Sequence, residues 1–277
     1  MSEETANETG KNPSWWRRVG RGPKWLIATI APIIVATAVP GVAPWATDHI
    51  RDLLGQPPLS AISSAEPGLL AGSYWATNSI LTAPYSDEIY TAIQNEGGVQ
   101  IGTSGQLITL TSNRAGQIDI EQVTAVIEAR QPPLAGTAFI APPQGGGIGL
   151  TVQFHLDSGD QVPALVPSDP NYPDKNLKPY LADGSYLYLE QGKSEPIAIQ
   201  ATTTTCYCQW RVRINYVYRG QAGQITVPPP GQRPFGTTAW ASHYRVEYDT
   251  NVFHAGIPPA RYDCVAEPAR CEVGPFR

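Results

Sequence analysis

The chain has 277 residues and a formal net charge of −5, and only 16% of its residues are charged. An acidic chain lacks the basic surface that nucleic-acid-binding proteins need, so we expect no nucleic-acid partner. The 26 glycines and 27 prolines interrupt long helices, which excludes helical bundles and coiled coils and favours a loop-rich β protein.

The first predicted element is an uncharged segment near the N-terminus. No residue between Lys24 and Asp48 is charged, and residues 25–47 would extend about 34 Å as a helix at roughly 1.5 Å per residue. That length exceeds the roughly 30 Å hydrocarbon core of a bilayer. We therefore predict a transmembrane helix and its extension in residues 23–54, with the lipid bilayer as its partner.

The residues that flank this segment indicate its orientation. Trp25 and Trp45 bracket it, where interfacial indoles are expected. Upstream, residues 11–24 contain no acid, and the bases closest to the predicted membrane are Arg17, Arg18, Arg21 and Lys24. By the positive-inside rule, residues 1–22 are a disordered basic cytoplasmic tail of a single-pass protein in the cell membrane, and the C-terminal bulk lies outside.

Two alternatives to an uncleaved anchor stay open. Pro32 interrupts the segment, and its best apolar stretch, Trp25 to Val39, falls within signal-peptide length, with Ala36-Thr37-Ala38 as a small-x-small cleavage pattern. Against cleavage, Pro40 would stand second in the mature chain. The remaining alternative is a buried helix of a soluble protein. An anchor is the preferred interpretation.

Two further regions follow the predicted anchor. Residues 55–70 are rich in proline and serine and are predicted to form a tether. Residues 71–277 are predicted to form one extracytoplasmic β-rich domain. Two segments of this domain, Leu150 to Asp157 and His243 to Tyr248, alternate between apolar and polar residues, as strands with one buried face do.

The strongest strand signal of this domain runs from Cys206 to Tyr218, where the even positions are apolar and most odd positions are polar. Such alternation is typical of an antiparallel sheet with a second layer on its apolar face. The predicted fold class is therefore mainly β: one N-terminal transmembrane helix followed by a single antiparallel β-sandwich-like domain. A small β-barrel is the alternative.

The four cysteines are expected to form disulfides, because an extracytoplasmic domain with an even number of cysteines favours oxidation. Cys264 and Cys271 enclose a short loop and are the preferred pair. Cys206 and Cys208 are a second disulfide or thiol pair, although they share one face of a strand, which would strain a bond between them. Cross-links between the strand and the C-terminal tail are the other pairings. No metal site and no cofactor are predicted.

No catalytic set can be assembled from the motifs. The G-x-S-x-G pattern is absent, the four histidines are scattered, and no phosphate-binding loop occurs. Among the aromatic side chains of the strand 206–218, Tyr207 is expected on the wet face, beside Arg211 and Arg213. These three residues are weak candidates for a binding surface.

The chain resembles single-pass membrane proteins of actinobacteria that have no assigned activity. The resemblance rests on the basic tail, the Trp-flanked helix and the Pro-rich tether, together with Cys206-Tyr207-Cys208-Gln209-Trp210 and Arg233-Pro234-Phe235-Gly236-Thr237-Thr238. It implies an architecture and no catalytic residue. The sequence therefore predicts a membrane-anchored module that binds an envelope protein or glycan. The alternative is a cell-envelope hydrolase with a carboxylate-based site.

Overall fold

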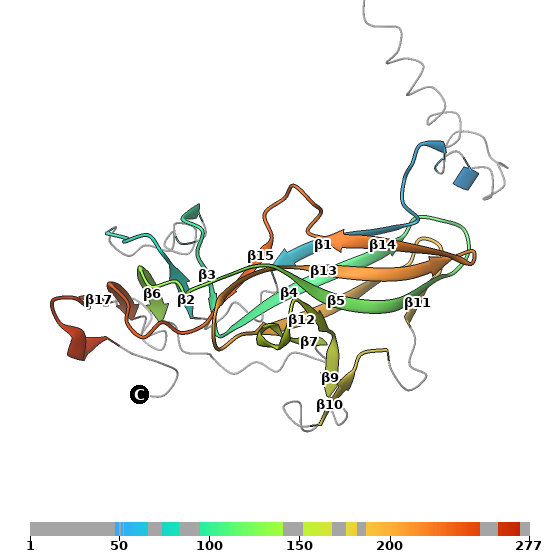
Figure 1. The fold of residues 1–277 in the computed structure, drawn as a ribbon. Coiled ribbons are helices and arrows are strands. Elements are labelled where there is room, and N and C mark those ends of the chain that lie inside the picture. Colours follow the sequence, from blue (N-terminus) through green and yellow to red (C-terminus); the bar gives the residue numbers. More distant parts are fainter. Residues whose placement is uncertain are drawn as a thin grey trace, which may run out of the picture. The chain divides into compact units, whose positions relative to one another are not determined.

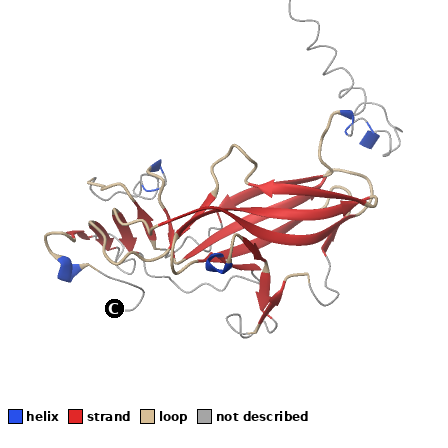
Figure 2. Ribbon diagram, in the orientation of Figure 1, coloured by secondary structure: helices blue, strands red, loops and turns tan. Residues whose placement is uncertain are grey.

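A computed structural model describes residues 48–49, 51, 53–65, 74–82, 93, 95–140, 152–167, 176–181, 187–249 and 260–271. In these residues the protein is mainly β (Figure 2). The chain divides into two units, residues 1–56 and 57–277.

The predicted membrane anchor lies outside the described residues, together with its flanking residues Trp25, Trp45, Arg17, Arg18, Arg21 and Lys24. In the described part of the chain, no helix combines the length and the apolar character that a bilayer crossing requires. Membrane insertion and orientation therefore stay predictions.

The predicted tether, residues 55–70, is wrong where it overlaps the first strand, β1 (Leu59–Ala65). All seven residues of β1 pair with β4, from Leu59 opposite Ser112 to Ala65 opposite Gln106. Leu59 is fully buried in the core. The serine-rich composition of β1 is typical of a linker. The segment nevertheless forms a strand, because pairing with β4 satisfies the hydrogen-bonding groups of its backbone. The β domain thus begins near Pro57, before the predicted boundary at residue 71.

Among the described residues, the first sheet, sheet A, has six strands in the order β1-β4-β12-β7-β9-β10 (Figure 1). Besides β1, they are β4 (Thr103–Ser112), β12 (Ser194–Thr202), β7 (Val152–His155), β9 (Leu165–Pro167) and β10 (Leu177–Pro179). A short 3-10 helix, η2 (Leu156–Ser158), follows β7.

The second sheet, sheet B, has the order β11-β5-β13-β15-β3-β2-β6-β16-β17, with β14 beside β13 and β8 beside β5. Its strands are β2 (Trp75–Thr77), β3 (Val99–Ile101), β5 (Ile118–Gln131), β6 (Thr137–Ile140), β8 (Gln161–Pro163), β11 (Leu187–Leu189), β13 (Tyr207–Tyr218), β14 (Gln221–Val227), β15 (Phe235–Thr238), β16 (Val246–Asp249) and β17 (Ala260–Asp263). A 3-10 helix, η3 (Pro268–Arg270), follows β17.

The main core contains side chains from both sheets. Sheet A contributes residues of β1, β4, β7 and β12, and sheet B contributes residues of β5 and β13. The strand signal at 206–218 is confirmed: Cys208, Trp210, Val212, Ile214, Tyr216 and Tyr218 of β13 are all buried. Burying the apolar face of β13 against sheet A is the expected consequence of its period-two pattern.

The prediction of antiparallel sheets is wrong for three pairs of strands. β12 pairs with β7, β15 with β3, and β16 with β6, all in parallel. Both sheets are therefore mixed. Parallel neighbours need long crossover connections, and each of these pairs joins strands far apart in the sequence. Alternation within one strand carries no information about the direction of such a distant neighbour.

The part of sheet B beyond β15 has side-chain clusters on both faces. Ala76, Ala138 and Ile140 belong to one cluster, together with both cysteines of the C-terminal pair. Trp75 and Phe139 belong to another. Because neighbouring residues of a strand point to opposite faces, these clusters lie on opposite sides of β2 and β6. Both faces of this region are therefore buried.

Candidate functional site

An uncovered stretch of the β5 edge defines the candidate site. β13 pairs with β5 along one edge, from Ile118 to Gln131, so the other neighbours of β5 share the opposite edge. There β11 pairs with residues 118–120 and β8 with residues 124–126. Among the described residues, no strand covers residues 121–123, which we call the edge interval.

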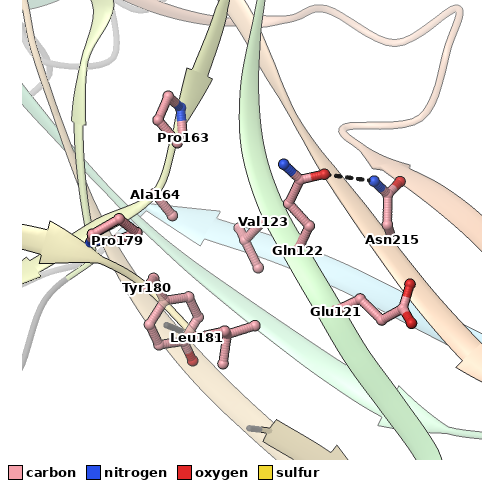
Figure 3. A pocket seen from close by; sticks show the side chains of 9 residues that line it. All are labelled: Glu121, Gln122, Val123, Pro163, Ala164, Pro179, Tyr180, Leu181 and Asn215. Carbon is pink, nitrogen blue, oxygen red and sulfur yellow. Dashed lines mark hydrogen bonds between the residues drawn. The ribbon is translucent and has the colours of Figure 1, made fainter. Parts of the chain in front are cut away.

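The edge interval lines a pocket with a volume of about 390 Å³ (Figure 3). This volume falls in the lower part of the roughly 300–1,000 Å³ range of small-molecule sites. All three residues of the interval contribute, together with Asn215 from β13 and with residues at and just after the ends of β8 and β10. The pocket therefore forms where the chain passes from sheet B to sheet A.

A β-bulge places Glu121 in the pocket. Asn215 pairs with Gln122 and the next residue, Tyr216, pairs with Ile120, so Glu121 is the extra residue of β5. The side chain of Glu121 is exposed. β-bulges redirect side chains and are frequent beside functional sites, and here the bulge adds a carboxylate to the pocket.

Two amide side chains form the polar rim. Asn215 donates from Nδ2 to Oε1 of Gln122 over 2.9 Å (Figure 3). The remaining amide atoms, Nε2 of Gln122 and Oδ1 of Asn215, make no hydrogen bond with the described part of the chain. The pair thus presents one donor group and one acceptor atom side by side.

The opposite wall is aromatic and apolar. Tyr180 and Leu181 follow β10, and both pack partly against the main core. The backbone N–H of Tyr180 donates to the carbonyl of Ala164, and that of Ala164 donates to the carbonyl of Val123. These two bonds hold the wall beside the edge interval. Leu181 has a φ of 64°, a strained conformation for leucine that recurs at ligand sites.

The environment of Tyr180 keeps its hydroxyl protonated. Burial raises the pKa of Tyr180, and the nearby negative charge of Glu195 raises it further. The phenol is therefore neutral at physiological pH and can both donate and accept a hydrogen bond.

The prediction that Tyr207 lies on an exposed surface is wrong, because only 8% of the surface of this residue is accessible. It belongs to the cluster that covers one face of sheet B beyond β15. β13 extends into this region, so its first residue is buried although it points away from the main core. The hydroxyl accepts a hydrogen bond from Nε2 of Gln209 over 3.0 Å.

The prediction that Arg211 lies on the surface is also wrong, since this residue is only 7% exposed. Its Nε donates to Oε1 of Glu128 over 2.6 Å, and its terminal nitrogens donate to the carbonyls of Pro228, Pro229 and Gln232. Three of these four directed bonds hold the loop between β14 and β15 against the sheet, and the fourth joins Arg211 to Glu128 of β5. Arg211 is therefore structural.

Arg213 is half-buried on the same face of β13 as Asn215. It is not among the residues that line the pocket. Of the three candidates on this strand, it is the one that lies beside the candidate site, two residues from Asn215.

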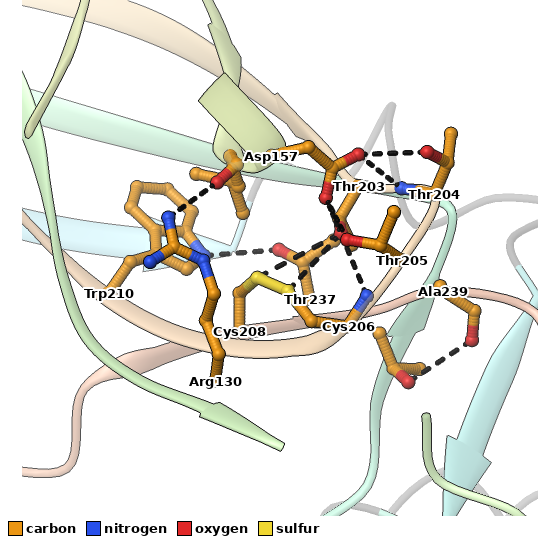
Figure 4. The surroundings of a disulfide bond; sticks show 12 residues. Arg130, Asp157, Thr203, Thr204, Thr205, Cys206, Cys208, Trp210, Thr237 and Ala239 are labelled. Atoms are coloured by element: carbon orange, nitrogen blue, oxygen red, sulfur yellow. Dashed lines mark hydrogen bonds between the residues drawn. A yellow bond between two sulfur atoms is a disulfide. The ribbon is translucent and has the colours of Figure 1, made fainter. Parts of the chain in front are cut away.

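A second cluster surrounds the disulfide between Cys206 and Cys208 (Figure 4). Asp157, from η2, accepts hydrogen bonds from the hydroxyls of Thr203, Thr204 and Thr205 and from the backbone N–H of Thr204, at 2.7–2.9 Å. Arg130 anchors the same loop from β5, through an ion pair with Asp160 and hydrogen bonds to the carbonyls of Leu156 and Gly159. The cluster fastens one loop to both sheets.

These bonds change the ionisation of Asp157. Burial alone would raise the pKa of this carboxyl, but the hydrogen bonds from Thr203, Thr205 and Thr204 outweigh it and lower the pKa below its usual value of 3.8. The stabilisation is thus present above the unfolded pKa and is lost as the pH falls through the folded one.

Replacing Asp157 by asparagine is expected to destabilise the domain by about 1–2 kcal/mol at pH 7, after allowance for its solvent exposure. The difference from wild type should begin to shrink below the unfolded pKa of about 3.8, where the unfolded carboxyl takes up a proton, and should shrink further as the pH falls through the lower pKa of the folded carboxyl. Urea unfolding at pH 7 and pH 3 measures both effects. Glu121→Gln, an exposed carboxylate without these bonds, is the control and should differ little from wild type. An Asp157→Asn deficit that does not change with pH would contradict the proposed role of its charge.

The preferred pairing of the other cysteines is confirmed. Cys264 and Cys271 form a disulfide across a separation of seven residues, and all four cysteines are paired. Both sulfurs are buried in the cluster with Tyr244, where burial raises the pKa of this tyrosine to about 12. This bond closes the loop that contains η3.

Sequence reasoning missed the pocket residues. Glu121, Gln122 and Asn215 are ordinary polar residues in a strand pattern, and the segment with Pro179, Tyr180 and Leu181 shows no periodicity. The only local signal is the polar Glu121-Gln122 pair, where the alternation of residues 118–129 shifts by one residue. Such a shift marks a bulge.

Comparisons with known proteins add no functional information. A scan against protein-family models gives no match, and a search of curated proteins gives none either.

Proposed function

We propose that this chain is a membrane-anchored, extracytoplasmic binding module, and that its ligand, an envelope component, binds in the pocket at the edge interval. The observation that carries the proposal is the pocket itself. It combines a volume of about 390 Å³ with a carboxylate, two adjacent amides and an aromatic wall, on a two-sheet scaffold.

The proposed location of the β domain outside the cytoplasm is supported mainly by the sequence. The uncharged residues 25–47 follow a basic tail, and both disulfides fit a compartment outside the cytoplasm. Two buried disulfides are typical of a domain that functions in an oxidising compartment such as the cell envelope.

A hydrolase is the less favoured alternative. Glycoside hydrolysis needs two carboxyl groups on either side of the bond that is cleaved. Among the described residues that line the pocket, Glu121 is the one acidic side chain. The described residues thus favour binding over catalysis.

Site-specific photo-crosslinking in native membranes tests the binding function. A photoreactive amino acid at position 180 of the full chain should crosslink an envelope component, because this side chain forms a wall of the pocket. Position 62 is the matched control, since Ile62 is 71% exposed on the edge strand β1 and lies outside the pocket. A product specific to position 180 supports the proposal. No product at 180, or identical products at both positions, contradicts it.

Protease treatment of intact cells tests the orientation. The β domain should be cleaved or released from outside, whereas a tag fused before residue 22 should stay protected. Protection of the region after residue 60 would show that the orientation is wrong.

A further inference from the structure

We propose that the pocket at the edge interval accommodates an uncharged saccharide ring, such as the end of a neutral glycan. This inference rests on the proposed binding function and specifies the ligand class. It follows from three properties of the pocket: its length along the strand, the pattern of its hydrogen-bonding groups and its charge.

The length of the edge interval disfavours an extended peptide. Peptides that add to a sheet edge pair with several backbone groups, and strands usually comprise five or six residues. Here β11 ends its pairing at Ile120 and β8 begins at Thr124, which leaves three residues. The carbonyl of Val123 is already bonded to Ala164. The interval is therefore too short for an added strand and suits a compact group.

The rim matches a ligand with neighbouring hydroxyls. Each hydroxyl both donates and accepts. The amide pair of Gln122 and Asn215 offers a donor group and an acceptor atom next to each other, and Glu121 adds carboxylate acceptors. A saccharide ring carries several hydroxyls at its edge, so it can satisfy the donor and the acceptors together.

The apolar wall matches the faces of the same ring. The faces of a pyranose expose C–H groups, which need apolar surface. Tyr180 and Leu181, which are only partly buried, supply such surface in the pocket (Figure 3). A small inorganic ion would leave this wall without a partner.

The charge of the lining argues against an anionic ligand. Among the described lining residues, Glu121 is charged and none is basic. Arg213 lies two residues from Asn215 on the same face of β13, but it does not line the pocket. A phosphate or a uronic acid would therefore meet like charge. A small inorganic cation would pair with Glu121, but it would leave the donor group of the amide pair without a match.

Ligand-observed NMR on the purified full-length chain tests the inference. The protein is held in a detergent without a sugar headgroup, so that the detergent does not compete. The neutral probes are N-acetylglucosamine and the methyl glycosides of mannose, galactose and arabinose; glucosamine and glucuronate are the cationic and anionic counterparts. At least one neutral probe should give saturation transfer, and glucuronate should give none.

Matched variants locate the binding. Glu121→Gln and Gln122→Ala change exposed side chains, so folding should be retained, and each should weaken binding of the neutral probe roughly fivefold to tenfold. Asp119→Asn alters an exposed carboxylate of the same strand outside the pocket and should leave binding unchanged.

The outcomes separate the two proposals. Binding of glucosamine or glucuronate alone overturns the neutral-saccharide inference. If no probe binds while crosslinking at position 180 still captures an envelope component, the ligand class is wrong but the binding function stands. If neither experiment gives a signal, both proposals fail. Neutral binding that the two variants leave unchanged also overturns the inference, because it would place the sugar elsewhere.

Discussion

Replacing Trp210 by alanine is expected to destabilise the domain by about 3–5 kcal/mol, the usual cost of removing a fully buried aromatic side chain. Trp210 is 0% exposed and lies near the start of β13. Its ring packs against Phe154 of sheet A and Phe235 of β15, with centroids 5.9 and 4.9 Å away. Its indole N–H donates to Oγ1 of Thr237 over 3.0 Å. The substitution would leave a cavity between the two sheets and remove one buried hydrogen bond.

Thermal and urea unfolding of the full chain measure this effect. The midpoint temperature should fall by on the order of 10 °C for a domain of this size. Trp210→Phe keeps most of the volume and should cost less than alanine. Ile62→Ala, at a residue that is 71% exposed, should change stability little. If Trp210→Ala and Ile62→Ala had similar effects, the position of the core between the sheets would be wrong.

Replacing Arg211 by methionine is expected to cost about 3 kcal/mol, near the lower end for breaking a buried ion pair. The lower end applies because Glu128 is partly exposed and can be solvated after the change. Methionine keeps the apolar stem but removes four donated hydrogen bonds, which leaves the carbonyls of Pro228, Pro229 and Gln232 without this partner. The loop between β14 and β15 should then detach from the sheet.

Two variants separate charge from geometry at this position. Arg211→Lys restores the charge but not the planar fork, so we expect it to recover only part of the stability. Glu128→Gln should cost less than Arg211→Met, because it affects one of the four bonds. Residues 228–230 are prolines without an amide hydrogen, so hydrogen exchange should show increased exchange at the amides of Gly231 and Gln232 in Arg211→Met. Full stability of the lysine variant would refute a role for the directed bonds.

These two neighbouring residues show where local patterns suffice. The alternation of apolar and polar residues correctly predicts that Trp210 faces the core. The same alternation places Arg211 on the wet face, yet a proline-containing loop 17–21 residues further along the chain covers it. Burial on the second face depends on which distant segment folds over it, and a strand's own sequence does not encode that.

The pocket depends even more on distant segments. It needs β11 and β8 to stop at either side of residues 121–123, and it needs the segment after β10 to return to the same edge. A bulge defined by the register between β5 and β13 then adds Glu121. None of these conditions is a local property, so only the shift in the polar pattern at Glu121-Gln122 could have indicated the site.

The sequence by itself determined the mainly β class and the inward face of β13, and it favoured the pairing of Cys264 with Cys271 that the structure shows, because strand periodicity and short loop closure are local properties. The tertiary structure decided that residues 59–65 form an edge strand, that the sheets are mixed, and that Tyr207 and Arg211 are buried. It also brought together the walls of the pocket. These features arise from contacts between segments far apart in the chain, where the free energy gained by shared burial and pairing overrides local composition.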